Sequence, residues 1–426
     1  MPRFSAYPMY LFYTGIGAFA FSLMSTATVL YFIKAVDLGP TQLLLVGFVL
    51  EITVFLFEIP TGIVADLYSR RLSMAIGFFL MGCAFLLTSL FPLLLTILIS
   101  QVLWGIGYTF QSGADRAWIA DEMKTASMES IYLRGAQIGQ VAAFLGIGVS
   151  ILFAQLSLAF PIGIAGGLLI ITSLVIQAFF PETGFQPQSR QQKSLWQGMM
   201  GTFTEGVKTV RHHSLLTIML IMSLFMGLYG EGFDRLWQKH LLDSFTLPLF
   251  GQSGEILWFG GLNAVSLLLN ILVVEWLRRQ LQRTGKLTKG WVLLVIHLLL
   301  MGTILLFAWT VSLPFALAAY CSTFILRGVN QPLFTAWLNE SIHTPHLRAT
   351  LFSMQGQLAS FGEVIGGPLV MLVLFLSGGD SEVAGLTTSA FLLLPICFLL
   401  LLALRSKVVK YPSASDHTMT NDSAQL

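Results

Sequence analysis

Charged side chains are scarce in this chain: only 10% of its 426 residues are Asp, Glu, Lys or Arg. An ordinary soluble protein carries about 25%. A surface so poor in charge cannot stay hydrated over the whole molecule, which excludes a typical soluble globular protein. The 55% share of hydrophobic residues and the mean hydropathy of +0.78 agree with this, so most of the chain is expected to face lipid.

Cysteine is rare and the net charge is small. The three cysteines all lie inside apolar runs, which predicts small hydrophobic side chains and no disulfide framework. The formal net charge of +2 gives no sign of a nucleic-acid partner. A cleavable signal peptide is not expected, because the apolar run that contains Ala18-Phe-Ala20 continues to about Phe32.

The signatures of an enzyme or of a cofactor site are also missing. No glycine-rich phosphate loop is followed by Lys-Ser or Lys-Thr, which argues against ATP hydrolysis. His343 and His346 form the only close His-x-x-His spacing, and the proline between them disfavours one helical face, so no metal site is predicted. No Ser/His/Asp constellation indicates a hydrolase. The sequence therefore predicts a protein that is not an enzyme and holds no cofactor or metal.

Twelve segments are apolar enough to span a bilayer, which takes about 20 residues each. Short turns that contain Gly, Pro and Asp separate several of them. The predicted spans are residues 8–34, 41–66, 72–90, 93–121, 130–155, 160–180, 214–241, 253–277, 290–310, 313–341, 348–376 and 385–404.

The longest polar interruption divides these spans into two sets of six. We expect an all-α membrane protein with twelve transmembrane helices in two six-helix pseudo-repeats. Its predicted parts are an N-terminal bundle (1–180), a cytoplasmic linker (181–213), a C-terminal bundle (214–405) and a disordered cytoplasmic tail (406–426). The halves echo each other, because AWIADE (117–122) ends the fourth span and AWLNE (336–340) ends the tenth.

Lysine and arginine are distributed unevenly between the two ends of the predicted bundle. With the N-terminus inside, most of the 23 basic residues fall in cytoplasmic segments, and only Lys34 and Lys239 are clearly outside. The positive-inside rule therefore places both termini in the cytoplasm. An odd number of spans would remove the bias, so the bias supports the count of twelve.

Ionisable residues inside spans are costly and usually mark transport pathways or proton relays. Glu51 and Glu58 lie seven residues apart and so share one face of the second span. A carboxyl group in a low-dielectric setting can exchange a proton near neutral pH. Glu58 is therefore the first candidate for proton coupling, with a hydrogen-bonded packing role as the alternative. Glu51 is the second candidate and is expected near the outer rim.

The fourth and seventh spans carry further charge clusters. Asp115 and Arg116 are adjacent and point about 100° apart, so each needs another partner, on the second span or across the cavity. In the seventh span Glu231 and Arg235 can pair at four residues' spacing, which leaves Asp234 to find a different partner. This second cluster is either part of a site or a self-paired rim. The acids are candidates for proton coupling and the arginines for the substrate cavity.

Arg327 lies near the middle of the tenth span and is followed by Asn330 and Gln331. No acid lies within four residues of Arg327, so its counter-charge must come from another helix or from a substrate anion. Glu363 in the eleventh span is a candidate partner, either within a working site or as a buried structural pair. We take all four residues as candidates for the substrate cavity, and Arg327 as the first to test.

The turn between the second and third spans, EIPTGIVADLYSRR (58–71), resembles the signature loop of the major facilitator superfamily, roughly G-x-L-A-D-R-x-G-R-[RK]. Leu67 and Ser69 depart from it. The matching positions are Gly62, Ala65, Asp66, Arg70 and Arg71. The resemblance implies a conformational latch made by Gly62, Asp66, Arg70 and Arg71, which forms in one orientation of the halves and breaks in the other. The alternative is that the arginines are only topology signals and Asp66 is their counter-ion.

Other stretches resemble export branches of the same superfamily, and some depart from it. EIPTG (58–62) is similar to a drug-exporter-like branch, and YGEGFDRLW (229–237) resembles an efflux-type bacterial subgroup. The family often has an arginine early in the fourth span, and residues 100–105 contain none. The antiporter motif of the fifth span has lost its proline and its glycine pair in residues 135–144.

The resemblance implies alternating access by two halves around a central site. The expected function is proton-coupled export of small hydrophobic or amphipathic organic compounds by a monomer in a bacterial plasma membrane. Phe110, Trp118, Met226 and Trp237 give weak support for an apolar substrate. The first alternative is a uniporter or proton symporter of a polar or anionic metabolite held by Arg327. The second is a receptor or scaffold that transports nothing.

Overall fold

The computed structural model describes residues 5–123, 128–185, 213–248, 254–281, 286–342, 348–379 and 381–405, and within these ranges every regular element is an α-helix. The helices are α1 Ala6–Lys34, α2 Pro40–Leu67, α3 Arg70–Leu90, α4 Leu94–Gln111, α5 Ala114–Met123, α6 Met128–Ala154, α7 Ala159–Phe179, α9 Ser214–Ser244, α10 Gly254–Leu281, α11 Lys286–Trp309, α12 Leu313–Ser341, α13 Arg348–Leu376, α14 Glu382–Phe391 and α15 Leu394–Arg405. Because α4 and α5 form one crossing and α14 and α15 another, the predicted twelve spans are confirmed.

Eleven of these crossings are long and apolar enough to span a membrane by composition alone. The twelfth is α12, whose polar residues Arg327, Asn330 and Gln331 lower its hydropathy. A span that is less apolar than its neighbours must turn its polar residues toward the bundle interior or a cavity.

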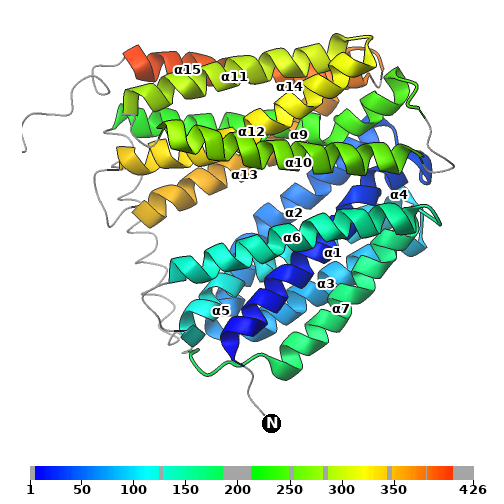
Figure 1. Cartoon of the computed structure of the whole chain (residues 1–426), viewed down its shortest axis with the longest axis vertical. Helices are drawn as coiled ribbons and strands as arrows, with labels where there is room; N and C mark the ends of the chain where they lie inside the picture. Colours follow the sequence, from blue (N-terminus) through cyan, green and yellow to red (C-terminus); the bar gives the residue numbers. More distant parts are fainter. Residues whose placement is uncertain are drawn as a thin grey trace, which may run out of the picture.

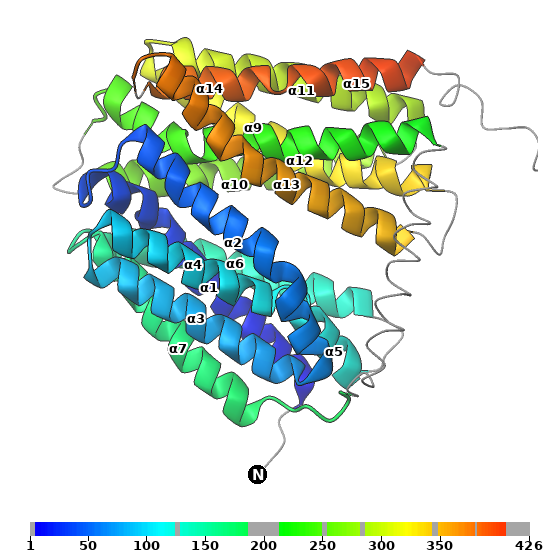
Figure 2. The ribbon, with the colours of Figure 1, turned by 180° about the vertical axis from the view of Figure 1, so that it is seen from behind.

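Each half of the molecule has its own hydrophobic core. One buried cluster is built almost entirely from α1–α7, and the other almost entirely from α9–α15 (Figures 1 and 2). The exact limits of the halves, at residues 180 and 214, remain predictions. Most of the predicted linker (residues 186–212) and the predicted tail (406–426) lie outside the described residues.

Two predicted spans are broken rather than continuous. The fourth crossing ends its first segment at Gln111 and resumes at Ala114, because Gly113 has φ +76, a left-handed conformation that cannot continue a right-handed helix. The twelfth crossing is interrupted between Phe391 and Leu394. Pro395 explains that break, since its ring would clash with the carbonyl one turn earlier.

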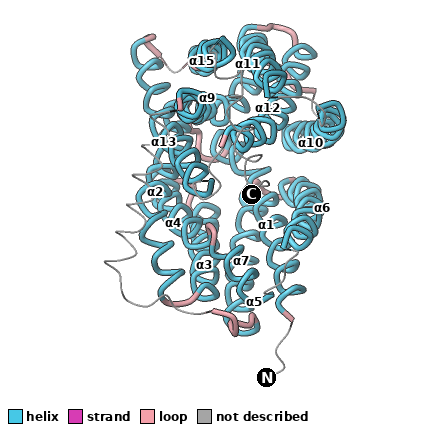
Figure 3. The backbone as a smooth tube through the Cα atoms, turned by 90° about the vertical axis from the view of Figure 1, so that its left-hand side faces the viewer, coloured by secondary structure: helices cyan, strands magenta, loops and turns pink. Residues whose placement is uncertain are grey.

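The two halves touch at one end and separate toward the other. We call the end where α1 begins and α15 ends the terminal face, and the opposite end the far face. At the far face Lys34 Nζ lies 2.8 Å from Glu255 Oε1, which joins α1 to α10. Figure 3, which looks onto the terminal face, shows α2 beside α13 and α6 beside α10 along the seam. Toward the terminal face the ribbons of the halves diverge (Figures 1 and 2).

Small residues bring α9 and α13 into close contact within the second half. A Cβ atom on Gly227 would overlap the Ala359 carbonyl oxygen, and one on Gly362 would overlap the Leu224 carbonyl oxygen. Only glycine permits this approach of two backbones. The contact places the polar residues of α9 next to those of α13, and this pair of helices builds one wall of the site.

Candidate functional site

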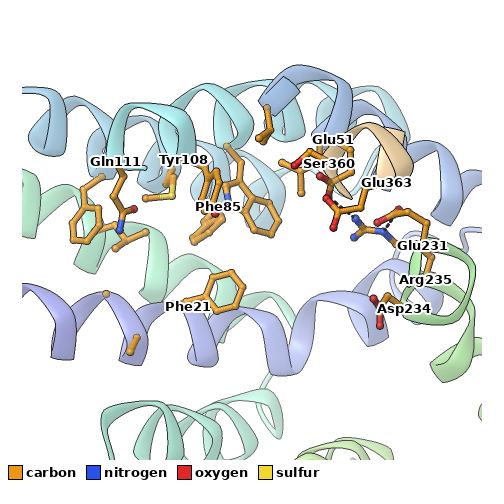
Figure 4. Close-up of a pocket in the computed structure, with 18 residues that line it drawn as sticks. Phe21, Glu51, Phe85, Tyr108, Gln111, Glu231, Asp234, Arg235, Ser360 and Glu363 are labelled. Carbon is orange, nitrogen blue, oxygen red and sulfur yellow. Dashed lines mark hydrogen bonds and ion pairs between the residues drawn. The ribbon is translucent and has the colours of Figure 1, made fainter. Parts of the chain in front are cut away.

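A cavity of about 670 Å³ lies between the two halves and is lined by helices from both of them (Figure 4). The first half contributes residues of α1, α2, α3, α4 and α7, and the second half those of α9 and α13. The lining residues are Gly17, Ala18, Phe21, Leu50, Glu51, Val54, Phe78, Met81, Phe85, Trp104, Tyr108, Gln111, Leu169, Glu231, Asp234, Arg235, Ser360 and Glu363. A central cavity shared by two bundles is where a transporter of this build holds its cargo.

One part of the wall is aromatic and comes from the first half alone. Trp104 packs edge-on against Phe85, with ring centroids 5.3 Å apart, and against Phe21 at 6.2 Å. Tyr108 follows one turn after Trp104 on α4, so both rings lie on the same face of that helix. These rings present an apolar surface to the cavity (Figure 4).

The part of the wall next to these rings is a cluster of charges in which Arg235 is central (Figure 4). Its Nη2 lies 3.3 Å from Glu51 Oε1 on α2, and its Nε lies 3.3 Å from Glu231 Oε2 one turn earlier on α9. The predicted pair of Glu231 with Arg235 is therefore present, and Glu51 lies in the cavity rather than near the outer rim. A Cβ on Gly47 would overlap Arg235 Nε, so glycine there lets the guanidinium reach α2.

Arg327 pairs with Asp234 and not with Glu363, which corrects the prediction from sequence. Its Nη1 lies 2.5 Å from Asp234 Oδ1 and its Nη2 lies 2.7 Å from Oδ2, a bidentate arrangement. The guanidinium carbon also lies 5.8 Å from the ring centroids of Tyr229 and Phe233. Helix α9 therefore supplies both the partner and the aromatic surroundings of this arginine.

Among the described residues, Glu363 is the one acid of the cavity that forms no ion pair with an arginine. Within the described part of the chain its carboxylate makes no hydrogen bond or ion pair, although it lines the cavity beside Glu51 and Arg235. The cluster as a whole contains four carboxylates and two guanidinium groups, so it carries excess negative charge when its acids are ionised. A cavity with this balance attracts cations, including protons.

Three other predicted residues lie away from this cluster. Glu58 does not line the cavity, and its Oε1 accepts a hydrogen bond from Ser112 Oγ at 3.0 Å, beside the break between α4 and α5. Asp115 was expected to pair with the second span or across the cavity. Instead its Oδ1 accepts a hydrogen bond from the Arg116 backbone N–H at 2.7 Å, in the first turn of α5. Neither Asp115 nor Arg116 lines the cavity.

The polar residues that follow Arg327 also lie outside the cavity wall. Asn330 is buried, its Nδ2 lies 4.0 Å from Met226 Sδ, and its Oδ1 has no partner among the described residues. Gln331 is exposed. The structure therefore places Arg327 one helix away from the cavity and connects it to the cavity only through Asp234.

The motif between α2 and α3 forms ion pairs inside the first half. Arg70 lies 3.7 Å (Nη2 to Oδ1) from Asp66 and also pairs with Asp121 on α5. Arg71 lies 3.8 Å (Nε to Oε2) from Glu182, just after α7. Among the described residues these three pairs join no part of the second half. The latch role of Gly62, Asp66, Arg70 and Arg71 thus remains a prediction, and it concerns the other orientation of the halves.

Ser69, which departs from the family pattern, has a structural role. Its Oγ accepts a hydrogen bond from the Leu72 N–H at 2.9 Å and so caps the N-terminus of α3. The same hydroxyl donates to Glu182 Oε2 at 2.7 Å. The serine at the position where the family pattern has glycine therefore adds a hydrogen bond between this turn and Glu182, just after α7.

Sequence reasoning missed the aromatic wall and Gly47. The aromatic and methionine residues that were expected to favour an apolar substrate, Phe110, Trp118, Met226 and Trp237, are not among the lining residues. The wall instead uses Phe21, Phe78, Phe85, Trp104 and Tyr108. Aromatic residues are frequent in every span, and only the packing of the helices decides which of them face a shared space.

Comparisons with known proteins agree with this architecture. The sequence model of the Major Facilitator Superfamily matches residues 10–367. The chain is 23% identical over 401 residues to the uncharacterized MFS-type transporter YxaM of Bacillus subtilis (strain 168), covering 91% of this chain and 94% of that protein.

Solved structures show the same fold at low identity. The nucleoside transporter NupG superposes with a TM-score of 0.76 at 15% identity, over 95% of this chain and 100% of that one. A bacterial homologue of the human lysosomal transporter Spinster, in an inward-facing and unoccupied conformation, gives 0.70 at 16% identity, over 94% and 97%. The chain belongs to the Major Facilitator Superfamily and is a multi-pass membrane transporter of that type, not an enzyme.

Proposed function

We propose that this transporter exports small amphipathic organic compounds in exchange for protons, by alternating access. The terminal face would then lie on the cytoplasmic side of a bacterial inner membrane, with both termini inside. The protein would transport as a monomer. The lysine and arginine distribution supports this orientation. In that orientation the structure, closed at the far face, corresponds to a state that receives its substrate from the cytoplasmic side.

The single observation that carries the proposal is the composition of the central cavity. Its aromatic wall suits an apolar body, and its cluster of carboxylates suits protons or a polar group. Both lie in one space of about 670 Å³, which is large enough for a small organic molecule. A substrate and a proton can therefore influence the same ionisable groups, which is what coupling requires.

Glu51 is the proton carrier in this proposal, in place of Glu58. Its partner Arg235 belongs to the other half, so this ion pair must lengthen or break when the halves separate at the far face. The side chain of Glu51 is only 19% exposed, and a largely buried carboxylate that loses its counter-charge is disfavoured unless it binds a proton. Opening toward the far face would thus favour proton uptake by Glu51. When the halves close again at the far face and the ion pair of Glu51 with Arg235 re-forms, Glu51 would release its proton toward the terminal face.

The alternative function is uniport or symport of a polar or anionic metabolite held by Arg327. The similarity to the nucleoside transporter NupG extends to the fold alone, but transport of a polar metabolite by a protein of the same fold supports this alternative. However, both terminal nitrogens of Arg327 are already bound to Asp234. An anion would have to displace that carboxylate, which favours the export proposal.

The test is a pH-jump experiment in proteoliposomes that records efflux of a panel of hydrophobic dyes. Wild type is compared with Glu51→Gln and with Glu58→Gln, which removes the same charge outside the cavity. We expect gradient-driven dye movement in wild type and in Glu58→Gln, and its loss in Glu51→Gln. Dye movement that is equal in all three proteins would contradict the assignment of Glu51. The absence of any dye movement in the wild type would favour the metabolite alternative.

A further inference from the structure

The charges of the cavity are not equally available to a ligand. Arg235 is engaged by Glu51 and Glu231, and Asp234 is engaged by Arg327. Among the acidic and basic residues of the wall, Glu363 alone has no hydrogen bond or ion pair within the described residues. Arg235 is therefore paired with two carboxylates, whereas Glu363 faces the cavity with no partner in the described part of the chain (Figure 4).

The cavity also has a second, neutral polar end. The amide of Gln111 lies at the end opposite the charge cluster, with the rings of Phe21, Phe85 and Tyr108 between them (Figure 4). Gln111, Tyr108 and Trp104 recur at helical spacing on one face of α4. Seven residues of helix rise by about 10 Å, which is close to the length of two linked aromatic rings.

We propose that this cavity is selective for elongated aromatic compounds with a cationic group at one end and an uncharged hydrogen-bonding group at the other. Glu363 is the specificity-determining residue, because it supplies the counter-charge for the cation. Gln111 pairs with the neutral polar group, and the aromatic wall covers the body between them. This inference rests on the proposed export function and names the substrate class of the same cavity.

Several features of the wall disfavour the other charge types. An anion would meet four carboxylates and an arginine that already has two partners. A neutral compound would displace water from Glu363 without supplying a counter-charge, which costs free energy when the carboxylate is ionised. A cation removes that cost and can also lie against the faces of Phe21 and Tyr108.

The test uses biphenyl probes that differ only at their two ends. One end carries an aminoethyl, hydroxyethyl or carboxyethyl group, and the other end carries a hydroxyl group or hydrogen. Binding to the purified full-length protein in nanodiscs is measured by calorimetry at neutral pH. We expect the aminoethyl probe to bind at least about tenfold more tightly than the hydroxyethyl probe, and the carboxyethyl probe to bind most weakly.

Variants assign this preference to single residues. Glu363→Gln should remove the preference for the amine, whereas Glu363→Asp, which retains the charge, should keep most of it. Gln111→Ala should reduce the gain from the hydroxyl end group without changing the order of the three charge types. The matched control is Glu275→Gln on α10, whose carboxylate pairs with Arg279 away from the cavity and should leave every affinity unchanged.

The outcomes separate this inference from the proposed function. Equal binding of the three charge types, an unchanged order in Glu363→Gln, or binding of none of the probes overturns the inference. If Glu363→Gln fails to fold, the order of the three probe affinities in wild type and in Glu363→Asp still tests the inference. Binding in the expected order without pH-driven flux of the amine would leave the inference standing and reject proton-coupled export. Gradient-driven flux of dyes without charge preference would support proton-coupled export and overturn the inference about the substrate class.

Discussion

Arg235 of α9 and Glu51 of α2 form an ion pair that joins the two halves of the transporter beside its central cavity, with 3.3 Å between Nη2 and Oε1. Glu231 holds the same guanidinium from one turn earlier on α9. One partner therefore moves with Arg235, while the other belongs to the opposite half. A change in the angle between the halves therefore alters the contact of Arg235 with Glu51 and leaves its contact with Glu231 in place. The ion pair of Glu51 with Arg235 can thus report and control the conformation.

Removal of the pair should shift the conformational equilibrium. We expect Arg235→Gln to populate a state that is more open at the far face, because the charged contact between α2 and α9 is lost. Spin labels at Leu156 and Val311, exposed far-face residues of opposite halves, would show a new population at longer distance. Arg279→Gln, on an exposed turn of α10, is the control and should leave the distances as in wild type. A single unchanged distance in Arg235→Gln would show that other contacts hold the far face closed.

Gly47 should be required for this contact although it carries no chemistry. In Gly47→Ala the new Cβ would overlap Arg235 Nε, so the guanidinium must move away from Glu51. We expect transport to fall about as far as in Glu51→Gln, with the protein still folded. The control is Gly167→Ala, where a Cβ meets no atom within 4 Å and helix propensity favours alanine by up to about 1 kcal/mol. Normal transport by Gly47→Ala would mean that the side chain of Arg235 can adapt.

Asp234 and Arg327 should be coupled energetically. Each single change, Asp234→Asn or Arg327→Gln, leaves one charge without its partner, and the double variant removes both charges. Because both side chains are only partly exposed, we expect a coupling energy of about 1–3 kcal/mol, measured from thermal unfolding of the four proteins in detergent. The exposed pair of Glu275 and Arg279 provides a matched cycle, with an expected coupling of at most about 0.5 kcal/mol. Equal coupling in the two cycles would argue against a special role for Asp234 and Arg327.

Close packing of α9 on α13 should depend on Gly362. A Cβ there would overlap the Leu224 carbonyl oxygen, so Gly362→Ala must push the two backbones apart. We expect a loss of about 1–3 kcal/mol of stability, seen as a lower midpoint of thermal unfolding. Gly356→Ala tests the same change on the same helix, where a Cβ meets no atom within 4 Å, and should not destabilise. A midpoint that is unchanged in Gly362→Ala would show that α9 and α13 can separate without cost.

Local helical geometry explains why part of the site could be predicted from the sequence. Residues four apart on a helix are neighbours, so the contact of Glu231 with Arg235 follows from their spacing. The partner of Arg327 could not be predicted in this way, because it lies on another helix. Both Asp234 and Glu363 were possible by charge, and only the tertiary structure shows that the side chain of Arg327 reaches Asp234.

Glu58 lies outside the cavity for a related reason. Glu51 and Glu58 share one face of α2, but the cavity extends along only part of that helix. The break at Gly113 brings Ser112 to Glu58 and gives it a hydrogen-bond partner beyond the cavity. The spacing of two residues predicts a shared face of a helix, whereas the depth at which a cavity ends depends on how all the helices pack.

The amino-acid sequence by itself determined the class of this protein: twelve spans, two halves, and polar residues that are costly enough in lipid to mark the functional region. These properties follow from hydropathy and helical periodicity, which are local in the chain. Only the tertiary structure decided which side chains meet in the cavity. It placed the aromatic wall opposite the acids, used Gly47 to bring Arg235 to Glu51, and left Glu363 without a partner among the described residues. Contacts between helices depend on crossing angles and close backbone packing, and no single stretch of sequence encodes them.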